Sequence, residues 1–259
     1  MKRQAAALAL SILALTGISA ASAATIQQEN LRISVFAQIQ PYKLPRATTA
    51  PIAVFVAGHI ATPSGAVPPQ LQKMTVKVNR HGLLQSQGLA TCTLVEIKTA
   101  SSARALSQCQ DALVGSGRFW ASIVLPDQRP YPTRGRLLIF NGKRAGKPVL
   151  FVHIYTTQPF ATSFVITFAI KHIAKGPYGT ALSASLPQAL GSWGFVNRIK
   201  LTLRRRYSYR GRKLSYFNAS CPAPRGTRAT SFPLALASFG FAETTTIDLE
   251  VSKSCGIKE

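Results

Sequence analysis

The stretch "GRLLIFNGKRAGKPVLFVHIY", residues 135–155, decides the fold class of this chain. It consists of two apolar runs of strand length, separated by a short polar segment that contains glycine and lysine. Within that segment Asn141-Gly142 is the residue pair that a tight turn between antiparallel strands favours. The stretch therefore predicts a β-hairpin with its turn at Asn141-Gly142.

A similar pattern recurs on both sides of this hairpin. Apolar and polar side chains alternate along residues 31–39 and 73–78, which is typical of strands with one buried face. Residues 51–60 form a nearly continuous apolar run, which predicts a strand buried on both faces. Further β-rich runs lie at 161–172, 178–186, 193–209, 214–219, 231–241 and 245–252. With Pro and Gly between them, these runs predict an all-β chain folded as an antiparallel β-sandwich, either one large or two small.

Two segments depart from the strand pattern. The segment "TASSARALSQCQDAL" offers Ser101 or Ser102 as an N-cap, followed by good helix formers, and predicts a short helix over about 102–108. The Pro-rich stretch 126–132 is the most linker-like part of the chain. It predicts either a boundary between two sandwiches or a long loop within one.

The N-terminus has the layout of a secretory signal peptide. Lys2 and Arg3 precede an apolar run over 5–18, and small residues follow with an A-x-A site at Ala21-Ser22-Ala23. We therefore predict a signal peptide over 1–23 and an exported β-rich region over 24–259. Beyond the signal peptide no apolar run is long enough to span a membrane as a helix. The protein is expected to be secreted, either extracellular or retained at the cell envelope, with no transmembrane segment after signal removal.

The chain has four cysteines, Cys92, Cys109, Cys221 and Cys255. An even number in an exported chain predicts two disulfides, for which three connectivities exist. Pairing by proximity in the sequence favours Cys92–Cys109 and Cys221–Cys255. The cysteines lack the spacing of metal ligands, so we expect neither a metal site nor a cofactor.

Charge is the strongest quantitative feature of the sequence. The formal net charge is +23, and positions 128–242 hold eighteen Lys and Arg but no Asp or Glu. A field of this size attracts polyanions and weakens with salt. The alternative to a polyanionic partner is a basic surface that only keeps the protein soluble. We predict as partner an anionic cell-wall polymer or polysaccharide.

The stretch "LTLRRRYSYRGRK", residues 201–213, lies at the centre of this acid-free interval. Strand alternation places Leu201, Leu203, Tyr207 and Tyr209 on one face and the cations on the other. Because the tyrosines fall away from most of the arginines, the pattern argues against a base-stacking site for nucleic acid. The segment 210–213 is expected to form a turn, and Arg205 remains as an unexplained charge on the apolar face. The predicted polyanion-binding residues are Lys200, Arg204, Arg206, Arg210, Arg212 and Lys213.

No catalytic motif is recognisable. The carboxylates are scattered without paired spacing, and the four histidines occur singly, at His59, His81, His153 and His172. The sequence therefore predicts no catalytic residues and favours a non-enzymatic protein. The alternative is a secreted carrier or hydrolase that acts on an anionic or lipidic ligand.

Two motifs near the C-terminus carry a resemblance. These are Tyr216-x-x-Ala219-x-Cys221-Pro222-Ala223-Pro224 and Phe232-Pro233-Leu234-Ala235. With them, nearly all of the exported region resembles a group of uncharacterised exported proteins of high-GC Gram-positive (actinobacterial) bacteria. The resemblance implies export and a β-rich body, and it implies no site residue.

Overall fold

The computed structural model describes residues 23–125, 129–158, 160–186, 194–242 and 246–258. Within these ranges most residues lie in strands, as the sequence predicts. The predicted signal peptide lies outside them except for Ala23. None of the helices in the described ranges is long and apolar enough to cross a membrane.

Thirteen strands form one sheet, in which each strand pairs with the next from one edge to the other. In that order they are β1 (Ala23–Gln28), β2 (Leu31–Gln40), β5 (Ala53–Ala61), β13 (Gly194–Leu203), β8 (Leu113–Ile123), β9 (Tyr131–Arg144), β10 (Lys147–Thr156), β11 (Thr162–His172), β12 (Tyr178–Ser185), β6 (Leu71–Asn79), β17 (Ala229–Phe241), β18 (Ile247–Ile257) and β3 (Lys43–Leu44). All neighbours are antiparallel except β18 and β3. Two small sheets join β4 (Ala50–Pro51), β16 (Phe217–Ala219) and β7 (Gly82–Leu84), and β14 (Arg206–Tyr209) with β15 (Arg212–Ser215).

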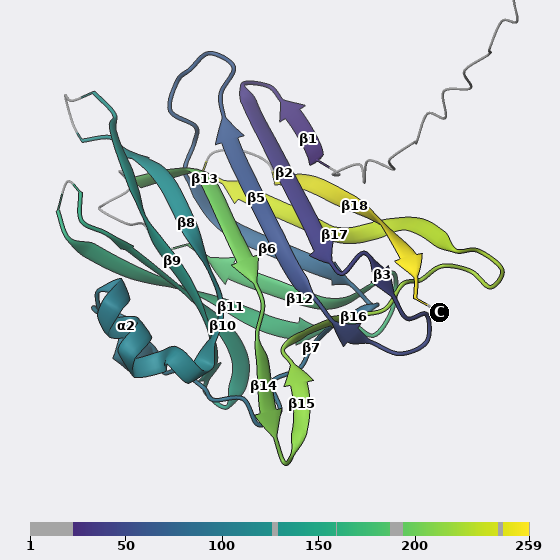
Figure 1. Cartoon of the computed structure of the whole chain (residues 1–259). Coiled ribbons are helices and arrows are strands. Elements are labelled where there is room, and N and C mark those ends of the chain that lie inside the picture. Colours follow the sequence, from purple (N-terminus) through teal and green to yellow (C-terminus); the bar gives the residue numbers. More distant parts are fainter. Residues whose placement is uncertain (1–22, 126–128, 159, 187–193, 243–245, 259) are drawn as a thin grey trace, which may run out of the picture.

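The large sheet curls until its first strands face its last ones. Figure 1 shows β1 and β2 beside β17 and β18. Leu31 and Ile33 of β2 pack there against Phe239 of β17 and Leu249 of β18. The two layers of the sandwich are therefore two parts of the same sheet. The segment 126–132, predicted as a boundary or a loop, follows β8, and its last two residues already belong to β9, which is paired with β8. Its residues 126–128 lie outside the described ranges.

Glycines on the inner face allow this curl. A Cβ atom at Gly135 of β9 would overlap the carbonyl oxygen of Tyr155 and the ring of Phe119. A Cβ atom at Gly117 of β8 would overlap the carbonyl oxygen of Lys200. Glycine in a strand interior commonly marks such close backbone approaches and sharp bends.

The turn of the β9–β10 hairpin differs from the sequence prediction. It lies at Ala145-Gly146, whose φ angles of 49° and 75° suit a tight two-residue turn. Asn141 is instead buried in β9, where its Nδ2 donates to the carbonyl oxygen of Ala90 at 2.8 Å and its carbonyl oxygen accepts from the Cys92 backbone at 2.9 Å. The prediction of a turn at Asn141-Gly142 was wrong because these two residues hold a crossing segment, and that contact is invisible to local sequence patterns.

The prediction for residues 51–60 was wrong, and the strands buried on both faces over much of their length are instead β9 and β10. Residues of β5 are mostly half-buried, whereas most side chains on both faces of β10 are buried. The reason is a helical layer that covers β9 and β10 and leaves β5 uncovered (Figure 1). The layer comprises α1 (Leu94–Ile97), α2 (Ser102–Cys109) and the 3-10 helix η1 (Gln110–Ala112).

The predicted helix is α2, and Ser101 is its N-cap, with its hydroxyl accepting from the Arg104 backbone at 3.3 Å. The helix α1 was not predicted, although Thr93 and Glu96 form a capping box that signals its start. Both predicted disulfides are present, Cys92–Cys109 within the helical layer and Cys221–Cys255 between the β16 segment and β18.

His153 of β10 lies beneath the helical layer with no exposed surface. Its Nε2 donates to the carbonyl oxygen of Ala100 at 2.9 Å, while its Nδ1 has no partner among the described residues. Burial lowers the pKa of His153 below the ordinary 6.5, and the hydrogen bond to Ala100 opposes that shift only in part. The folded protein therefore holds this imidazole in the neutral form.

We expect stability to fall as the pH drops below about 6.5. Below that pH, His153 is protonated in the unfolded chain but stays neutral in the folded protein. The contribution of His153 to the free energy of unfolding is therefore complete above the pKa of the unfolded chain and is lost as the pH falls toward the lower pKa of the folded protein. The slope from this group approaches about 1.4 kcal/mol per pH unit. Urea unfolding of the parent and His153→Leu between pH 8 and pH 5 measures it, with exposed His172→Gln as control. An unchanged pH slope in His153→Leu would contradict the prediction.

Candidate functional site

The six predicted polyanion-binding residues are all exposed, and the alternation that selected them is confirmed. Leu201, Leu203, Tyr207 and Tyr209 are half-buried, as is Arg205 on the same face, whereas the six predicted cations face solvent. The structure nevertheless divides the set, because β13 ends at Leu203. Lys200 lies in the large sheet, and the other five belong to the β14–β15 hairpin or to the segment that leads into it.

The β14–β15 hairpin projects from one end of the sandwich (Figure 1). Its turn consists of Arg210-Gly211, with φ angles of 49° and 72°, and is shorter than the predicted 210–213 because Arg212 and Lys213 already pair in β15. The Tyr207 hydroxyl donates to the carbonyl oxygens of Gln85 and Gln87 at 3.2 and 2.9 Å. The tyrosines of this stretch thus anchor the hairpin to the 85–91 segment.

Arg205 is explained by a partner far away in the sequence. Its Nη2 donates to the carbonyl oxygen of Asp111 at 2.9 Å and lies 3.8 Å from the Asp111 carboxylate. Its own carbonyl oxygen accepts hydrogen bonds from the Tyr216 backbone and the Ser215 hydroxyl. Arg205 therefore joins η1 to the base of the hairpin and has a structural role.

On the large sheet, the strand register brings Lys200 together with cations that the sequence analysis did not select. Lys200 of β13 is paired with Arg118 of β8, and Arg118 is paired with Arg136 of β9. All three are exposed on the outer face of the sheet. We call these three residues the cross-strand basic row. Like charges directly opposite one another destabilise a sheet, so the fold alone gives no reason for this arrangement.

A second set of cations lies two residues along the same strands. Arg198 of β13 pairs with Trp120 of β8, and Trp120 pairs with Arg134 of β9. The Arg198 guanidinium lies over the Trp120 ring, 5.9 Å from its centroid. We call the two sets together the basic face, which comprises Lys200, Arg118, Arg136, Arg198 and Arg134.

The charge of Arg198 also acts on a histidine of the neighbouring strand. His59 of β5 is paired with Arg198 in the ladder. Burial, and then the positive charge of Arg198, lower the pKa of His59 below its ordinary value. His59 is therefore neutral at pH 7 and adds no charge to this face.

The carboxylates of the described ranges lie elsewhere. Asp248 and Glu250 project from β18, and Glu250 accepts a hydrogen bond from the Tyr178 hydroxyl at 2.6 Å. Burial, with the bond to Glu250, raises the pKa of Tyr178 to about 12.

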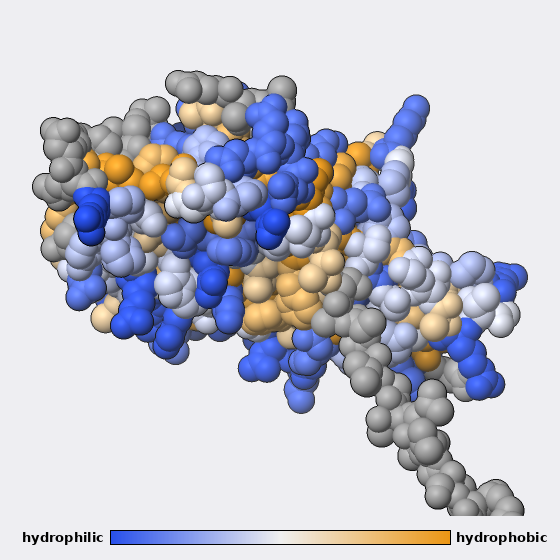
Figure 2. All heavy atoms as spheres, turned by 90° about the horizontal axis from the view of Figure 1, so that it is seen from above, coloured by the Kyte–Doolittle hydropathy of each residue, from blue (hydrophilic) through white to orange (hydrophobic). Residues whose placement is uncertain are grey.

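None of the five cations of the basic face pairs with a carboxylate in the part of the chain that the structure describes. In Figure 2, groups of strongly hydrophilic side chains border apolar surface.

Arg118, Arg134, Arg136, Arg198 and Trp120 are the site residues that sequence reasoning missed. A local signal exists, because Arg134 and Arg136 are two residues apart and so share a side of one strand, as do Arg118 and Trp120. Only the register between strands from distant parts of the chain places these pairs next to Lys200.

Two hollows differ in size and lining. A cleft of about 590 Å³ lies between the 86–91 segment and the β9–β10 hairpin, and its lining includes Lys143 but no Asp, Glu, His or Cys. A second cavity, inside the sandwich, is largely apolar but measures only about 60 Å³. Small-molecule pockets typically measure about 300–1,000 Å³. The cavity that the described residues line inside the sandwich is therefore smaller than a typical small-molecule pocket.

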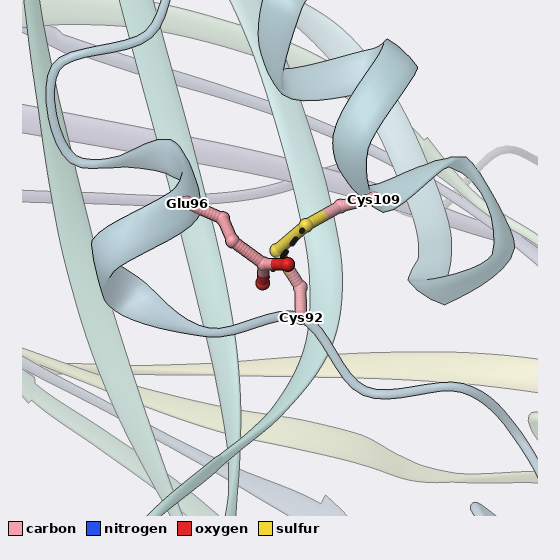
Figure 3. Close-up of side chains that lie close together, drawn as sticks. All are labelled: Cys92, Glu96 and Cys109. Atoms are coloured by element: carbon pink, nitrogen blue, oxygen red, sulfur yellow. Dashed lines mark hydrogen bonds between the residues drawn. A yellow bond between two sulfur atoms is a disulfide. The ribbon is translucent and has the colours of Figure 1, made fainter.

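Cys92, Glu96 and Cys109 form a close group within the helical layer, where Glu96 belongs to α1 and Cys109 is the last residue of α2 (Figure 3). The two sulfurs are joined in a disulfide, so neither is available as a thiolate ligand for a metal. The Glu96 carboxylate accepts hydrogen bonds from the Thr93 backbone and hydroxyl at 2.7 and 2.8 Å. The group caps and fastens α1.

One histidine lies within reach of a hydroxyl nucleophile. The Nδ1 atom of His81 is 2.9 Å from the Ser220 hydroxyl, and the backbones of the two residues are also hydrogen-bonded. Among the described residues no carboxylate is hydrogen-bonded to His81, and neither residue lines the cleft or the cavity. The pair ties the β6–β7 turn to β16.

The chain was compared with models of known protein families, with curated proteins and with solved structures, and none matches. The resemblance to exported proteins of high-GC Gram-positive bacteria therefore stays a prediction.

Proposed function

We propose that this protein is an exported, non-enzymatic protein of the cell surface or envelope that binds anionic polymers through its basic face. The observation that carries the proposal is the cross-strand basic row, in which three cations stand directly opposite one another and none pairs with a carboxylate of the described residues. A polymer with regularly spaced anionic groups would neutralise this repulsion. Binding of a polyanion would thus explain the cross-strand basic row, which folding alone does not explain.

The spacing of the basic face suits an extended ligand. Adjacent strands are about 4.8 Å apart, so the row spans about 10 Å across three strands. The second set of cations lies about 7 Å further along the strands. An array of this kind contacts several successive charges of a polymer at once. Export is supported by the two disulfides, which persist in oxidising compartments.

The alternative prediction of a carrier or hydrolase has less support. The cavity of about 60 Å³ that the described residues line inside the sandwich is smaller than a typical small-molecule pocket. The larger cleft is lined by residues without an acid–base pair.

The proposal is tested by binding of the exported region, residues 24–259, to long-chain inorganic polyphosphate in 50 mM and 300 mM NaCl. We expect the combined variant Lys200→Gln, Arg118→Gln and Arg136→Gln to bind about 30-fold more weakly at low salt, with a shallower salt dependence. The physical reason is the loss of three charge contacts, each worth up to about 1 kcal/mol. Isothermal titration calorimetry measures both quantities.

A matched control removes the same charge elsewhere. The variant Lys73→Gln, Lys77→Gln and Lys171→Gln neutralises three cations on β6 and β11. We expect it to keep most of the affinity. If both triple variants lose affinity equally, the overall charge and not the basic face is responsible. If the parent protein binds no polyphosphate at 50 mM salt, the proposed function is wrong.

A further inference from the structure

Aromatic side chains share the outer sheet surface with the basic face. Trp120 lies between Arg198 and Arg134 in the ladder. Phe36 of β2 and Phe55 of β5 belong to the same side, because Phe36 pairs with Ala57, the partner of Lys200, and Phe55 is two residues from Ala57. Their rings are in contact edge to face, with centroids 5.8 Å apart.

These three rings are not part of the interior. Each is half-buried, and none belongs to a hydrophobic core cluster of the described residues. The prediction against nucleic acid depended on Tyr207 and Tyr209. Tyr207 packs against the core, whereas the Tyr209 ring lies against Gly88 with the Arg210 guanidinium over it, 5.2 Å from its centroid. Other strands supply aromatic residues to the basic face instead. The physical objection to base stacking therefore no longer applies.

A purely anionic polymer leaves these rings unused. Phosphate chains need cations only, whereas single-stranded nucleic acid combines a charged backbone with flat bases that stack on aromatic side chains. The Arg198 guanidinium lies over the Trp120 ring, 5.9 Å from its centroid, so an aromatic ring and a cation stand side by side on the basic face. Five strands from β2 to β9 give a width of about 19 Å, comparable with a site for about four nucleotides.

We propose that the basic face binds single-stranded nucleic acid, with phosphates on the cross-strand basic row and bases stacked on Trp120 and on the Phe36–Phe55 pair. This inference rests on the proposed function, because it uses the same cations. It adds the substrate class: a polymer with flat bases in addition to charge.

The test compares two labelled oligonucleotides by fluorescence anisotropy in 100 mM NaCl. One is twelve thymidines long, and the other is an abasic 12-mer with the same phosphates and no bases. We expect the thymidine oligomer to bind about 30-fold more tightly than the abasic one, because two or more bases stack. Trp120→Ala should lower the affinity for the thymidine oligomer about tenfold and leave the abasic oligomer unchanged, while Trp120→Phe keeps most of the affinity.

Binding of the abasic oligomer also reports whether each variant is folded, since this binding needs an intact cross-strand basic row. As an aromatic control, Tyr42→Ala removes an exposed ring outside the basic face and should change neither affinity. If both oligomers bind equally and Trp120→Ala has no effect, the inference is overturned. The proposed function then still stands, provided the basic-row variant weakens polyphosphate binding.

A further arm of the same assay uses a uronic acid polysaccharide. If that polymer alone loses affinity in Trp120→Ala, the rings serve sugars and the nucleic-acid assignment is wrong. If no polyanion binds, the inference and the proposed function both fall.

Discussion

Replacement of Cys221 and Cys255 together by alanine is expected to lower the free energy of unfolding by about 4 kcal/mol. The disulfide closes a loop with a sequence separation of 34 residues, which restricts the unfolded chain. Both residues are buried, and the Cys221 backbone donates to the carbonyl oxygen of Pro45 at 2.8 Å. The bridge therefore holds the segment after β16 against the edge formed by β18 and β3.

Guanidinium chloride unfolding of the oxidised parent and the double variant measures this change. The matched control is Cys92→Ala with Cys109→Ala, whose separation of 17 residues predicts about 3 kcal/mol. Hydrogen exchange should then increase mainly in α1 and α2, whereas the first variant should affect β18. A cost below about 1 kcal/mol for both pairs would contradict the idea that each bridge stabilises by restricting the unfolded chain.

Gly135→Ala is expected to destabilise the protein by about 3 kcal/mol or more. The new methyl group would overlap the Tyr155 carbonyl oxygen, which is backbone, and the Phe119 ring. The neighbouring strand must move, because a carbonyl oxygen has no alternative rotamer. This displacement would flatten the sheet at the point where it curls between β8, β9 and β10.

Gly58→Ala is the control for this prediction. A Cβ atom there would meet only the side chain of Ile199, at 3.2 Å, and that side chain can adjust. We expect a change below about 1 kcal/mol. Thermal or chemical unfolding of both variants measures the difference, and equal effects would show that the curl does not depend on Gly135.

Several features of the fold followed from local patterns. The alternation along 199–210 correctly assigned core-facing and solvent-facing residues, because the two sides of a strand always alternate. The helix at α2 followed from a capping serine and a run of helix formers. The disulfide pairing followed from proximity along the chain, since short loops are the easiest to close.

Other features depended on contacts between distant segments. Asn141-Gly142 has the sequence of a turn, but Asn141 is hydrogen-bonded to Ala90 and Cys92 within the fold. The turn is formed by Ala145-Gly146 instead. Residues 51–60 have the composition of a doubly buried strand, but the helical layer covers β10. Which strand is covered depends on where the helices pack, and no pattern within either strand contains that information.

By itself, the sequence of this protein determined the strand faces, the helix after Ser101 and the excess of positive charge, and it favoured the cysteine pairs that the structure confirms. Only the tertiary structure decided which cations become neighbours. Lys200 meets Arg118 and Arg136 through pairing between strands that are far apart in the chain, and the same register adds Trp120. The physical reason is that a strand's own residues set its two faces, whereas its register is set by the strands beside it and by the curl of the whole sheet.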